Sequence, residues 1–194
     1  MVHLNTLLNK KFTLGDLIGI CNPDYNKIQK WRQYFKLSID LDPGHSNGRL
    51  NHAWLQQMIC DMSNGLIVYG GQGQKSADCY IAGHRTETKA FSPKYDKFHI
   101  AASSFFARNC KVAEYRSLMK KDVELARQFV FKHSYDKNEL YLLSGTAQLN
   151  CRFEDITLIL IEKKHLVSCL EPDFIKIKAS RIDNKLNEIG GNIA

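Results

Sequence analysis

The segment 76–91 restricts the fold of this chain more than any other, because its pattern predicts a β-hairpin. Two short stretches rich in β-branched, aromatic and small residues flank Gly83-His84. A glycine at the first central position of a two-residue loop suits a type II′ turn, and this turn pairs Ala82 with Arg85. The two stretches then become neighbouring antiparallel strands, and the rest of the chain has to build a sheet around them.

Three charged side chains fall on one face of the predicted hairpin. The expected register sets Asp78 opposite Lys89 and Tyr80 opposite Glu87. Because side chains alternate between the two faces of a strand, Asp78, Glu87 and Lys89 then point the same way. Two converging carboxylates can hold a hard divalent cation, and a nearby ammonium group can orient a water molecule or stabilise a phosphoryl transition state. An ordinary cross-strand charge cluster on an exposed face is the alternative.

This pattern resembles the PD-(D/E)xK nucleases, the superfamily of many type II restriction endonucleases. Asp78 matches the first acidic position, and Glu87-Thr88-Lys89 match the (D/E)xK element. Ala77 stands in place of the proline of the PD pair. The fold that this resemblance implies is an α/β fold with a mixed central sheet flanked by helices, built on a restriction-endonuclease-like αβββαβ core.

The resemblance, which covers residues 66–91, also implies a reaction. It implies a Mg²⁺-dependent endonuclease, with Mn²⁺ as a substitute, that hydrolyses phosphodiester bonds of double-stranded DNA at specific sequences, as type II restriction enzymes do. Asp78, Glu87 and the main-chain carbonyl of Thr88 would bind the metal, and Lys89 would help to position the attacking water. A resolvase or a repair nuclease could use the same residues.

The helix expected before the hairpin leaves one part of this site open. In several members of the family, that helix adds a carboxylate to the metal site. Here either Asp61 or Gln57 could face the site, and either could instead lie on the surface.

Residues on both sides of the hairpin are candidate contacts to a DNA backbone. The glycine-rich loop 70–73 lacks the lysine of a phosphate-binding P-loop and the spacing of a dinucleotide-binding motif, so no nucleotide cofactor is expected. Residues after this loop and just beyond the predicted catalytic strand would approach a phosphodiester near the metal. These candidates are Gln74, Lys75, Ser76, Lys94, Lys97 and His99. A plain turn and a solvated charged loop are the alternative interpretations.

The charge of the chain suits a nucleic acid but does not name a reaction. Its 194 residues carry a formal net charge of +7, and a basic surface also suits an RNA binder, a ribosomal protein or a peripheral membrane protein. A basic nucleic-acid-binding protein without catalysis is therefore the rival class. The six cysteines and seven histidines show no zinc-ligand spacing, which argues against a zinc hydrolase and an HNH nuclease.

The sequence predicts one domain, with a helical N-terminal part at 1–50, a catalytic core at 51–145, and C-terminal strands and a tail at 146–194. Apolar periodicity predicts helices at 13–21, 23–37, 51–63, 98–107, 121–132 and 180–189, and strands beside the hairpin at 66–69, 140–143, 156–161 and 166–170. Asn22 and Pro23 are expected to start the second helix as its N-cap and first-turn residues.

We expect a cytoplasmic protein that acts on DNA as a homodimer. No secretory signal is apparent and no apolar stretch is long enough to span a membrane, so no membrane partner is expected. One site cuts one phosphodiester at a time, so a double-strand break calls for two subunits about a twofold axis, or for a monomer that nicks each strand in turn. Aromatic residues around Trp31 and Phe35, and around Phe105 and Phe106, are either interface surfaces or core.

Overall fold

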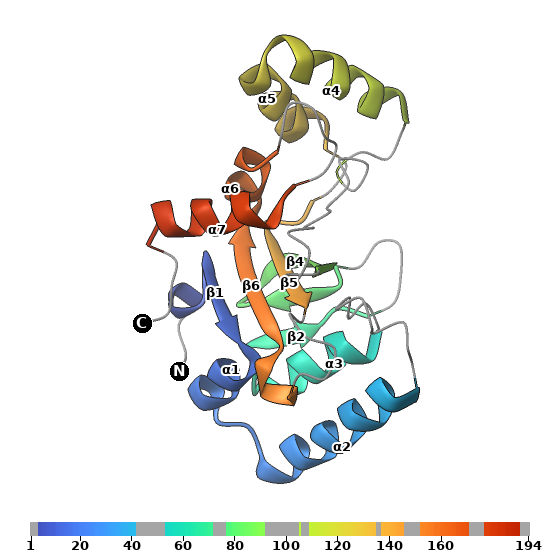
Figure 1. Cartoon of the computed structure of the whole chain (residues 1–194), viewed down its shortest axis with the longest axis vertical. Helices are drawn as coiled ribbons and strands as arrows, with labels where there is room; N and C mark the ends of the chain where they lie inside the picture. The colour runs from blue at the N-terminus through green and yellow to red at the C-terminus, as the bar shows by residue number, and fades with distance from the viewer. Residues whose placement is uncertain are drawn as a thin grey trace.

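The computed structural model describes residues 4–41, 53–71, 77–91, 105, 109–134, 137–145, 152–170 and 177–190, and this part contains one six-stranded sheet (Figure 1). Its strands are β1 (Lys10–Thr13), β2 (Ile67–Tyr69), β3 (Cys79–Ile81), β4 (His84–Phe91), β5 (Leu140–Gly145) and β6 (Thr157–Glu162). They lie in the order β1-β6-β5-β4-β3-β2, so strands from both ends of the chain share the sheet. β4 and β5 are parallel, whereas the other neighbouring pairs are antiparallel.

Seven α-helices accompany the sheet in the described part of the chain. They are α1 (Leu14–Cys21), α2 (Tyr25–Leu41), α3 (Ala53–Met62), α4 (Asn109–Lys121), α5 (Val123–His133), α6 (Lys163–Ser168) and α7 (Ala179–Glu188). α4 and α5 belong to the crossover that parallel strands β4 and β5 require, and they lie at the opposite end of the molecule from α2 in Figure 1. A mixed α/β fold with helices around a mixed sheet is therefore confirmed. No helix in the described ranges is long and apolar enough to cross a membrane.

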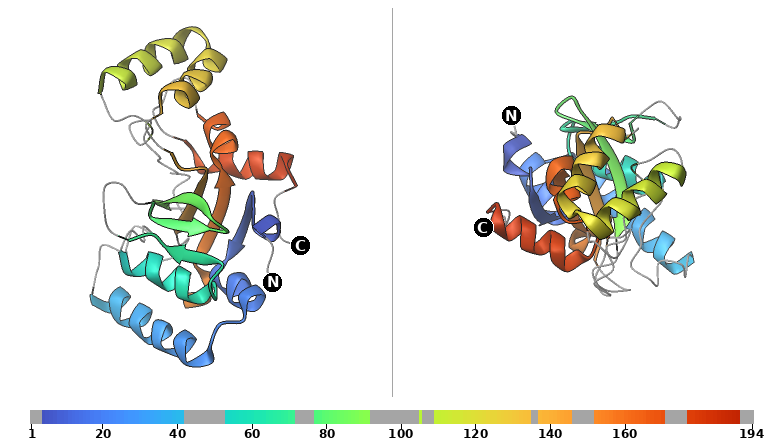
Figure 2. Two further views of the ribbon diagram at one scale, coloured as in Figure 1. Left: turned by 180° about the vertical axis from the view of Figure 1, so that it is seen from behind. Right: turned by 90° about the horizontal axis from the view of Figure 1, so that it is seen from above.

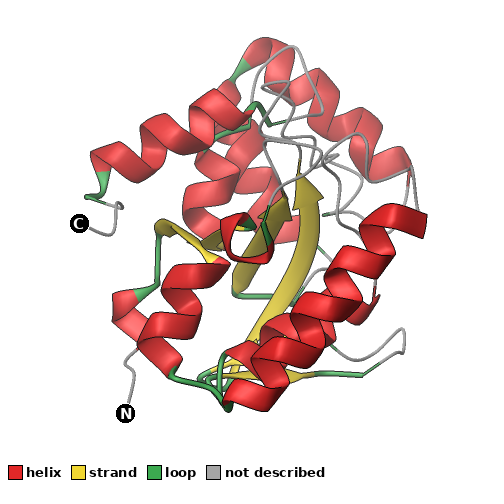
Figure 3. Cartoon of the chain, turned by 60° about the horizontal axis from the view of Figure 1, so that its bottom comes forward, coloured by secondary structure: helices red, strands yellow, loops and turns green. Residues whose placement is uncertain are grey.

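Helices cover both faces of the sheet, because β5 and β6 carry apolar side chains on both sides. Leu142 and Leu160 belong to a buried cluster with α1, α2 and α3, whereas Tyr141 and Ile159 belong to a second cluster with α4, α5, α6 and α7. Continuous apolar runs are typical of strands that are buried on both faces. Figure 2 gives this arrangement from behind and from above, and Figure 3 shows helices on both sides of the central strands.

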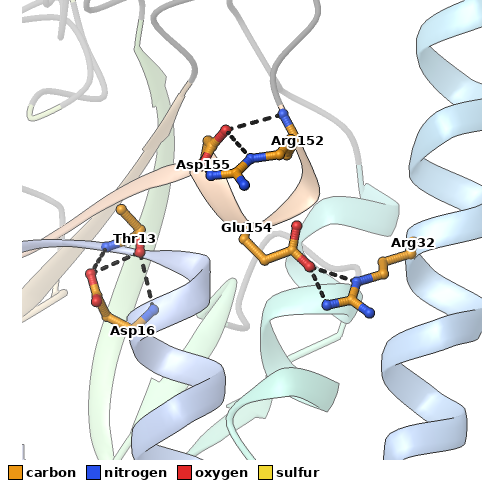
Figure 4. Close-up of polar contacts among 6 residues, drawn as sticks. All are labelled: Thr13, Asp16, Arg32, Arg152, Glu154 and Asp155. Carbon is orange, nitrogen blue, oxygen red and sulfur yellow. Dashed lines mark hydrogen bonds and ion pairs between the residues drawn. The ribbon is translucent and has the colours of Figure 1, made fainter.

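β1 leads directly into α1 through a capping box at Thr13 (Figure 4). The Thr13 Oγ1 accepts a hydrogen bond from the Asp16 N–H (3.0 Å), and the Thr13 N–H donates to Asp16 Oδ2 (2.7 Å). These bonds satisfy two main-chain N–H groups that the first turn would otherwise leave unpaired. α1 then ends at Asn22, which has a left-handed backbone (φ 47°) and donates its N–H to Ile18 O.

The expected roles of Asn22 and Pro23 at the start of the second helix are wrong. Asn22 is the C-cap of α1, and α2 begins only at Tyr25. Asp24 lies at the N-cap position instead, where its Oδ1 accepts a hydrogen bond from the Lys27 N–H (3.1 Å). Asparagine tolerates the left-handed region, so it serves the end of one helix as well as the start of the next.

Other elements also differ from the expectation. The apolar run expected as a strand at 166–170 lies mostly in α6, and its Leu166 and Val167 are buried under the helical layer. Periodicity alone does not distinguish a short buried strand from a short buried helix. Two observed elements, β1 and α4, have no counterpart in the sequence prediction. The helix expected at 98–107 lies outside the described residues except for Phe105.

The aromatic residues considered for a dimer interface are partly core. Phe35 is 3% exposed and Phe105 is 0% exposed, so neither side chain is available to a partner. Trp31 is half-buried, and Phe106 lies outside the described residues.

We predict that Thr13→Ala destabilises the protein by about 1 kcal/mol, because it removes the side-chain acceptor of the capping box. Urea denaturation measures the change in the free energy of unfolding. Thr6→Ala is the matched control, since Thr6 is exposed and lies outside the box, and it should leave the midpoint nearly unchanged. An equal loss in both variants would contradict the role of the cap.

Candidate functional site

The β3–β4 hairpin turns one residue earlier than the sequence predicts. Its pairs are Ile81 with His84, Tyr80 with Arg85, and Cys79 with Thr86. The two-residue loop is therefore Ala82-Gly83, and both residues have positive φ (50° and 86°), which is typical of a type I′ turn. The expected loop at Gly83-His84 is wrong, because His84 belongs to β4, where its Nδ1 lies 2.6 Å from Glu139 Oε2.

This earlier turn leaves the faces of the paired hairpin residues unchanged. Each residue of β3 pairs two positions away from its expected partner, and side chains alternate with a period of two. The expected pair of Asp78 with Lys89 is not formed, because the ladder ends at Cys79 with Thr86 and Asp78 lies in a bend before β3. Glu87 and Lys89 lie beside Tyr141 and Leu143 of β5, so they share the face that packs with α4 to α7.

Asp78 lies in the bend directly before β3, and its carboxylate replaces a main-chain acceptor there. Asp78 Oδ2 accepts hydrogen bonds from the Thr88 N–H and from Thr88 Oγ1, each 2.9 Å long. The N–H and C=O groups of one strand residue point toward the same neighbouring strand, so the Thr88 carbonyl points to the Asp78 side of β4. Within the described ranges, no donor bonds to Asp78 Oδ1. This oxygen is therefore available as a ligand, and the Thr88 carbonyl lies on the same side of β4.

A residue of α3 does reach the site, and it is Gln56. Its Nε2 donates a hydrogen bond to Thr88 Oγ1 (2.5 Å), while the same hydroxyl donates to Asp78. A chain of hydrogen bonds thus runs from α3 to the Asp78 carboxylate and fixes its orientation. The sequence offers no signal for this role, because the glutamine lies 32 positions from its partner in no recognisable motif.

The two α3 residues considered from the sequence face α2 instead. Asp61 accepts a hydrogen bond from the Trp31 Nε1–H (2.8 Å), and Gln57 lines the same space between the two helices. Consecutive helix positions lie about 100° apart around the axis, which separates Gln57 from its neighbour Gln56. Neither residue therefore completes the β3–β4 site in this structure.

Glu87 is held between two side chains. Lys89 Nζ contacts Glu87 Oε1, and Asn138 Nδ2 donates a hydrogen bond to Glu87 Oε2 (3.1 Å). The Glu87 and Lys89 side chains remain 26% and 31% exposed, so a ligand can still reach them. Asn138 comes from the segment just before β5, and no sequence pattern marks it as part of the site.

A buried thiol lies close to both carboxylates. Burial raises the pKa of Cys79, and repulsion from Cys60, Asp78 and Glu87 raises this pKa further. Cys79 is therefore a neutral thiol that offers no thiolate to a metal. The donors left at the site are oxygen atoms, which suit Mg²⁺ or Mn²⁺ rather than zinc.

The end of β2 packs tightly against the segment that carries Asp78. The Gly70 N–H donates a hydrogen bond to Asp78 O (2.9 Å). A Cβ atom on Gly70 would lie 1.9 Å from the Ala77 carbonyl oxygen, so only glycine allows this approach. The first glycine of the glycine-rich loop thus has a structural role in placing Asp78.

A magnesium ion at this site would have to keep part of its water shell. Among the described residues, no group of three or more His, Cys, Asp or Glu side chains could hold a metal ion. Mg²⁺ usually keeps several waters and needs only one or two carboxylates from the protein. Asp78 Oδ1, a Glu87 oxygen released from its present partner, and the Thr88 carbonyl are the matching donors.

The residues expected to contact DNA all lie outside the described part of the chain. They are Gln74, Lys75, Ser76, Lys94, Lys97 and His99.

Comparison with known proteins adds no relative: no family model, no curated protein and no solved structure matches this chain. The fold and the site define a mixed α/β protein in which one carboxylate lies at the start of a hairpin and a second carboxylate and a lysine lie on its other strand.

We predict that Gly70→Ala destabilises the protein by about 1–3 kcal/mol, because the added methyl group displaces the Ala77 carbonyl. Gly19→Ala is the matched control. Gly19 lies in α1 with no atom within 4 Å of the added Cβ, so alanine should stabilise the helix by about 0.5–1 kcal/mol. Urea denaturation measures the change in the free energy of unfolding for each variant. A change of the same sign in both variants would contradict the close approach at Gly70.

Proposed function

We propose that this protein is a metal-dependent endonuclease that hydrolyses phosphodiester bonds of double-stranded DNA at specific sequences, as type II restriction enzymes do, with Mg²⁺ as its cofactor. The observation that carries the proposal is that Asp78, in the bend before β3, bonds Thr88, the residue between Glu87 and Lys89 on β4. The order of elements supports it. α3, β2, β3 and β4 are followed by helices and by β5 parallel to β4, which is the order of an αβββαβ core.

The side chains around the site hold its charged groups in position. Gln56 and Thr88 orient the Asp78 carboxylate, and Asn138 orients Glu87. When bound, Mg²⁺ would polarise a phosphate oxygen and activate a water. Lys89 Nζ contacts the Glu87 carboxylate, and this amine would lie where the phosphodiester gains negative charge in the transition state.

A second cationic region supports a partner rich in phosphate. Arg127 of α5 and Arg181 and Lys185 of α7 line a pocket of about 420 Å³. Burial raises the pKa of Cys169 in this pocket to about 11, and the three positive charges act to lower it, so all three lie near the thiol. Glu188 also lines the pocket and pairs with Lys185 (2.7 Å). The excess of positive charge favours phosphate oxygens.

The rival function is a basic nucleic-acid-binding protein without catalysis, and one observation favours it. Both oxygens of Glu87 have partners, Lys89 Nζ and Asn138 Nδ2, as in an ordinary structural ion pair. This function needs no divalent cation. A resolvase or a repair nuclease would differ from a restriction enzyme in its DNA substrate rather than in these residues.

We predict that the protein cuts supercoiled plasmid in Mg²⁺ and leaves it intact in chelator. Asp78→Asn, Glu87→Gln and Lys89→Ala should each lower the cleavage rate by about 100-fold or more. Affinity for the plasmid should change little, because these groups act on one phosphodiester rather than on the whole duplex. Gel electrophoresis measures cleavage, and a gel-shift assay in Ca²⁺ measures binding.

Glu139→Gln is the control for these variants. Glu139 pairs with His84 at the turn of the hairpin and its side chain is 58% exposed, so its loss should leave the cutting rate unchanged. Full cutting by a site variant would exclude that residue from catalysis. Plasmid binding without cutting in either Mg²⁺ or Mn²⁺ would support the rival function. Linear product without a prior build-up of nicked circles would indicate the paired action of a homodimer.

A further inference from the structure

α2 and α3 enclose a groove of about 590 Å³ whose lining residues take no part in the β3–β4 site. The two helices lie next to each other at the lower end of Figure 1. The lining combines three aromatic rings with two lysines, one amide and one carboxylate: Lys27, Lys30, Trp31, Tyr34, Trp54, Gln57 and Asp61.

The aromatic rings form two adjoining walls of this groove. The Tyr34 ring stands edge-on to Trp31, with 5.7 Å between ring centroids and 83° between planes, and to Trp54, at 5.4 Å and 68°. Tyr34 is 47% exposed, so part of its ring is open to a ligand. Asp61 accepts the Trp31 Nε1–H (2.8 Å), which fixes the orientation of one indole ring.

The helix that carries most of the groove is firmly anchored. Arg32 of α2 donates its Nε to Glu154 Oε1 (2.5 Å) in the short 3₁₀ helix Phe153–Asp155 (Figure 4). Phe35, one position after Tyr34, is 3% exposed and packs against Phe153 at 5.8 Å. The aromatic walls are therefore held in place before a ligand binds, which lowers the entropic cost of binding.

The groove also favours a negatively charged ligand. Lys27 and Lys30 lie three positions apart on one face of α2, and both are exposed. Across the part of the chain that the structure describes, neither lysine has an ion-pair partner. The one carboxylate of the lining, Asp61, already accepts the Trp31 hydrogen bond.

We propose that this groove binds an unpaired nucleotide of single-stranded nucleic acid. Aromatic side chains that stack on bases, together with cations that contact the sugar-phosphate backbone, are the features of single-strand binding sites. The exposed part of Tyr34 with Trp31 and Trp54 supplies the stacking surface, and Lys27 and Lys30 contact the phosphates. Proline-rich peptides also dock on aromatic grooves, but the two lysines favour a polyanion. The proposal does not depend on DNA cleavage at Asp78.

Intrinsic fluorescence tests this proposal directly, because Trp31 and Trp54 are the two tryptophans of the chain and both line the groove. The full-length protein is titrated with a ten-residue oligothymidylate in chelator at low salt. We expect saturable quenching of tryptophan fluorescence, and weaker binding as salt is raised. A blunt duplex of the same length should quench less, since its bases are already stacked and paired.

Matched variants on α2 separate the groove from the rest of the helix. Tyr34→Ala should raise the Kd for the oligothymidylate by about 5-fold or more, and Tyr34→Phe should retain native binding because the ring is kept. Tyr25→Ala is the control, since Tyr25 lies on the same helix, is 69% exposed and does not line the groove. For charge, Lys30→Ala should weaken binding more than Lys36→Ala, a change of equal charge outside the lining.

Three results would overturn the proposal. One is the absence of quenching by oligothymidylate, and another is equal loss of binding in Tyr34→Ala and Tyr25→Ala. The third is quenching without the oligothymidylate. If a proline-rich peptide quenched the tryptophan fluorescence and the oligothymidylate did not, the groove would bind a peptide. If a rise in protein concentration alone did so, the groove would bind a second copy of the chain. Asp78→Asn should bind the oligothymidylate like the native protein, so failure of the proposed cleavage leaves this test valid.

Discussion

The hydrogen bonds between Asp78 and Thr88 are the interaction on which the candidate site depends. β3 begins at Cys79, directly after Asp78, so the Thr88 N–H lacks the main-chain acceptor that a longer strand would supply. An unpaired buried N–H is costly, and the Asp78 carboxylate removes this cost with one oxygen while its second oxygen stays available. Gly70 makes the arrangement possible, because it lets β2 approach the chain at Ala77. Stability of the sheet and placement of the proposed metal ligand are thus two results of one contact.

The parallel pairing of β4 with β5 determines the other half of the site. This pairing sets Thr86 beside Leu140, so the segment that leads into β5 arrives next to the start of β4. Asn138 lies in that segment and can therefore donate to Glu87. An antiparallel β5 would bring the opposite end of the strand to this place. The helical crossover through α4 and α5 thus supplies a polar side chain to the site as well as a cover for the sheet.

The faces of the hairpin could be predicted from the sequence, whereas its turn and its supporting contacts could not. Strand alternation holds for any shift of two residues, so Glu87 and Lys89 share a face despite the wrong loop. Asp78 lies in the bend before β3, and its carboxylate bonds Thr88 instead. The choice between the loops Ala82-Gly83 and Gly83-His84 depends on small differences in turn energy, because Gly83 is compatible with either loop. Gln56 and Asn138 lie 32 and 51 positions from their partners, and no local pattern encodes such distances. The strand expected at 166–170 is also wrong. Its apolar residues are buried in a helix, α6, by packing against other helices, and local sequence does not encode that packing.

α3 connects the two regions that the proposals concern. Its apolar side packs on the sheet, Gln56 reaches Thr88, and the next residue, Gln57, lines the groove against α2. Because the Gln56 hydrogen bond orients the Thr88 hydroxyl toward Asp78, the packing of α3 on the sheet also helps to place the Asp78 carboxylate. Side chains at consecutive positions of one helix thus belong to the two different regions.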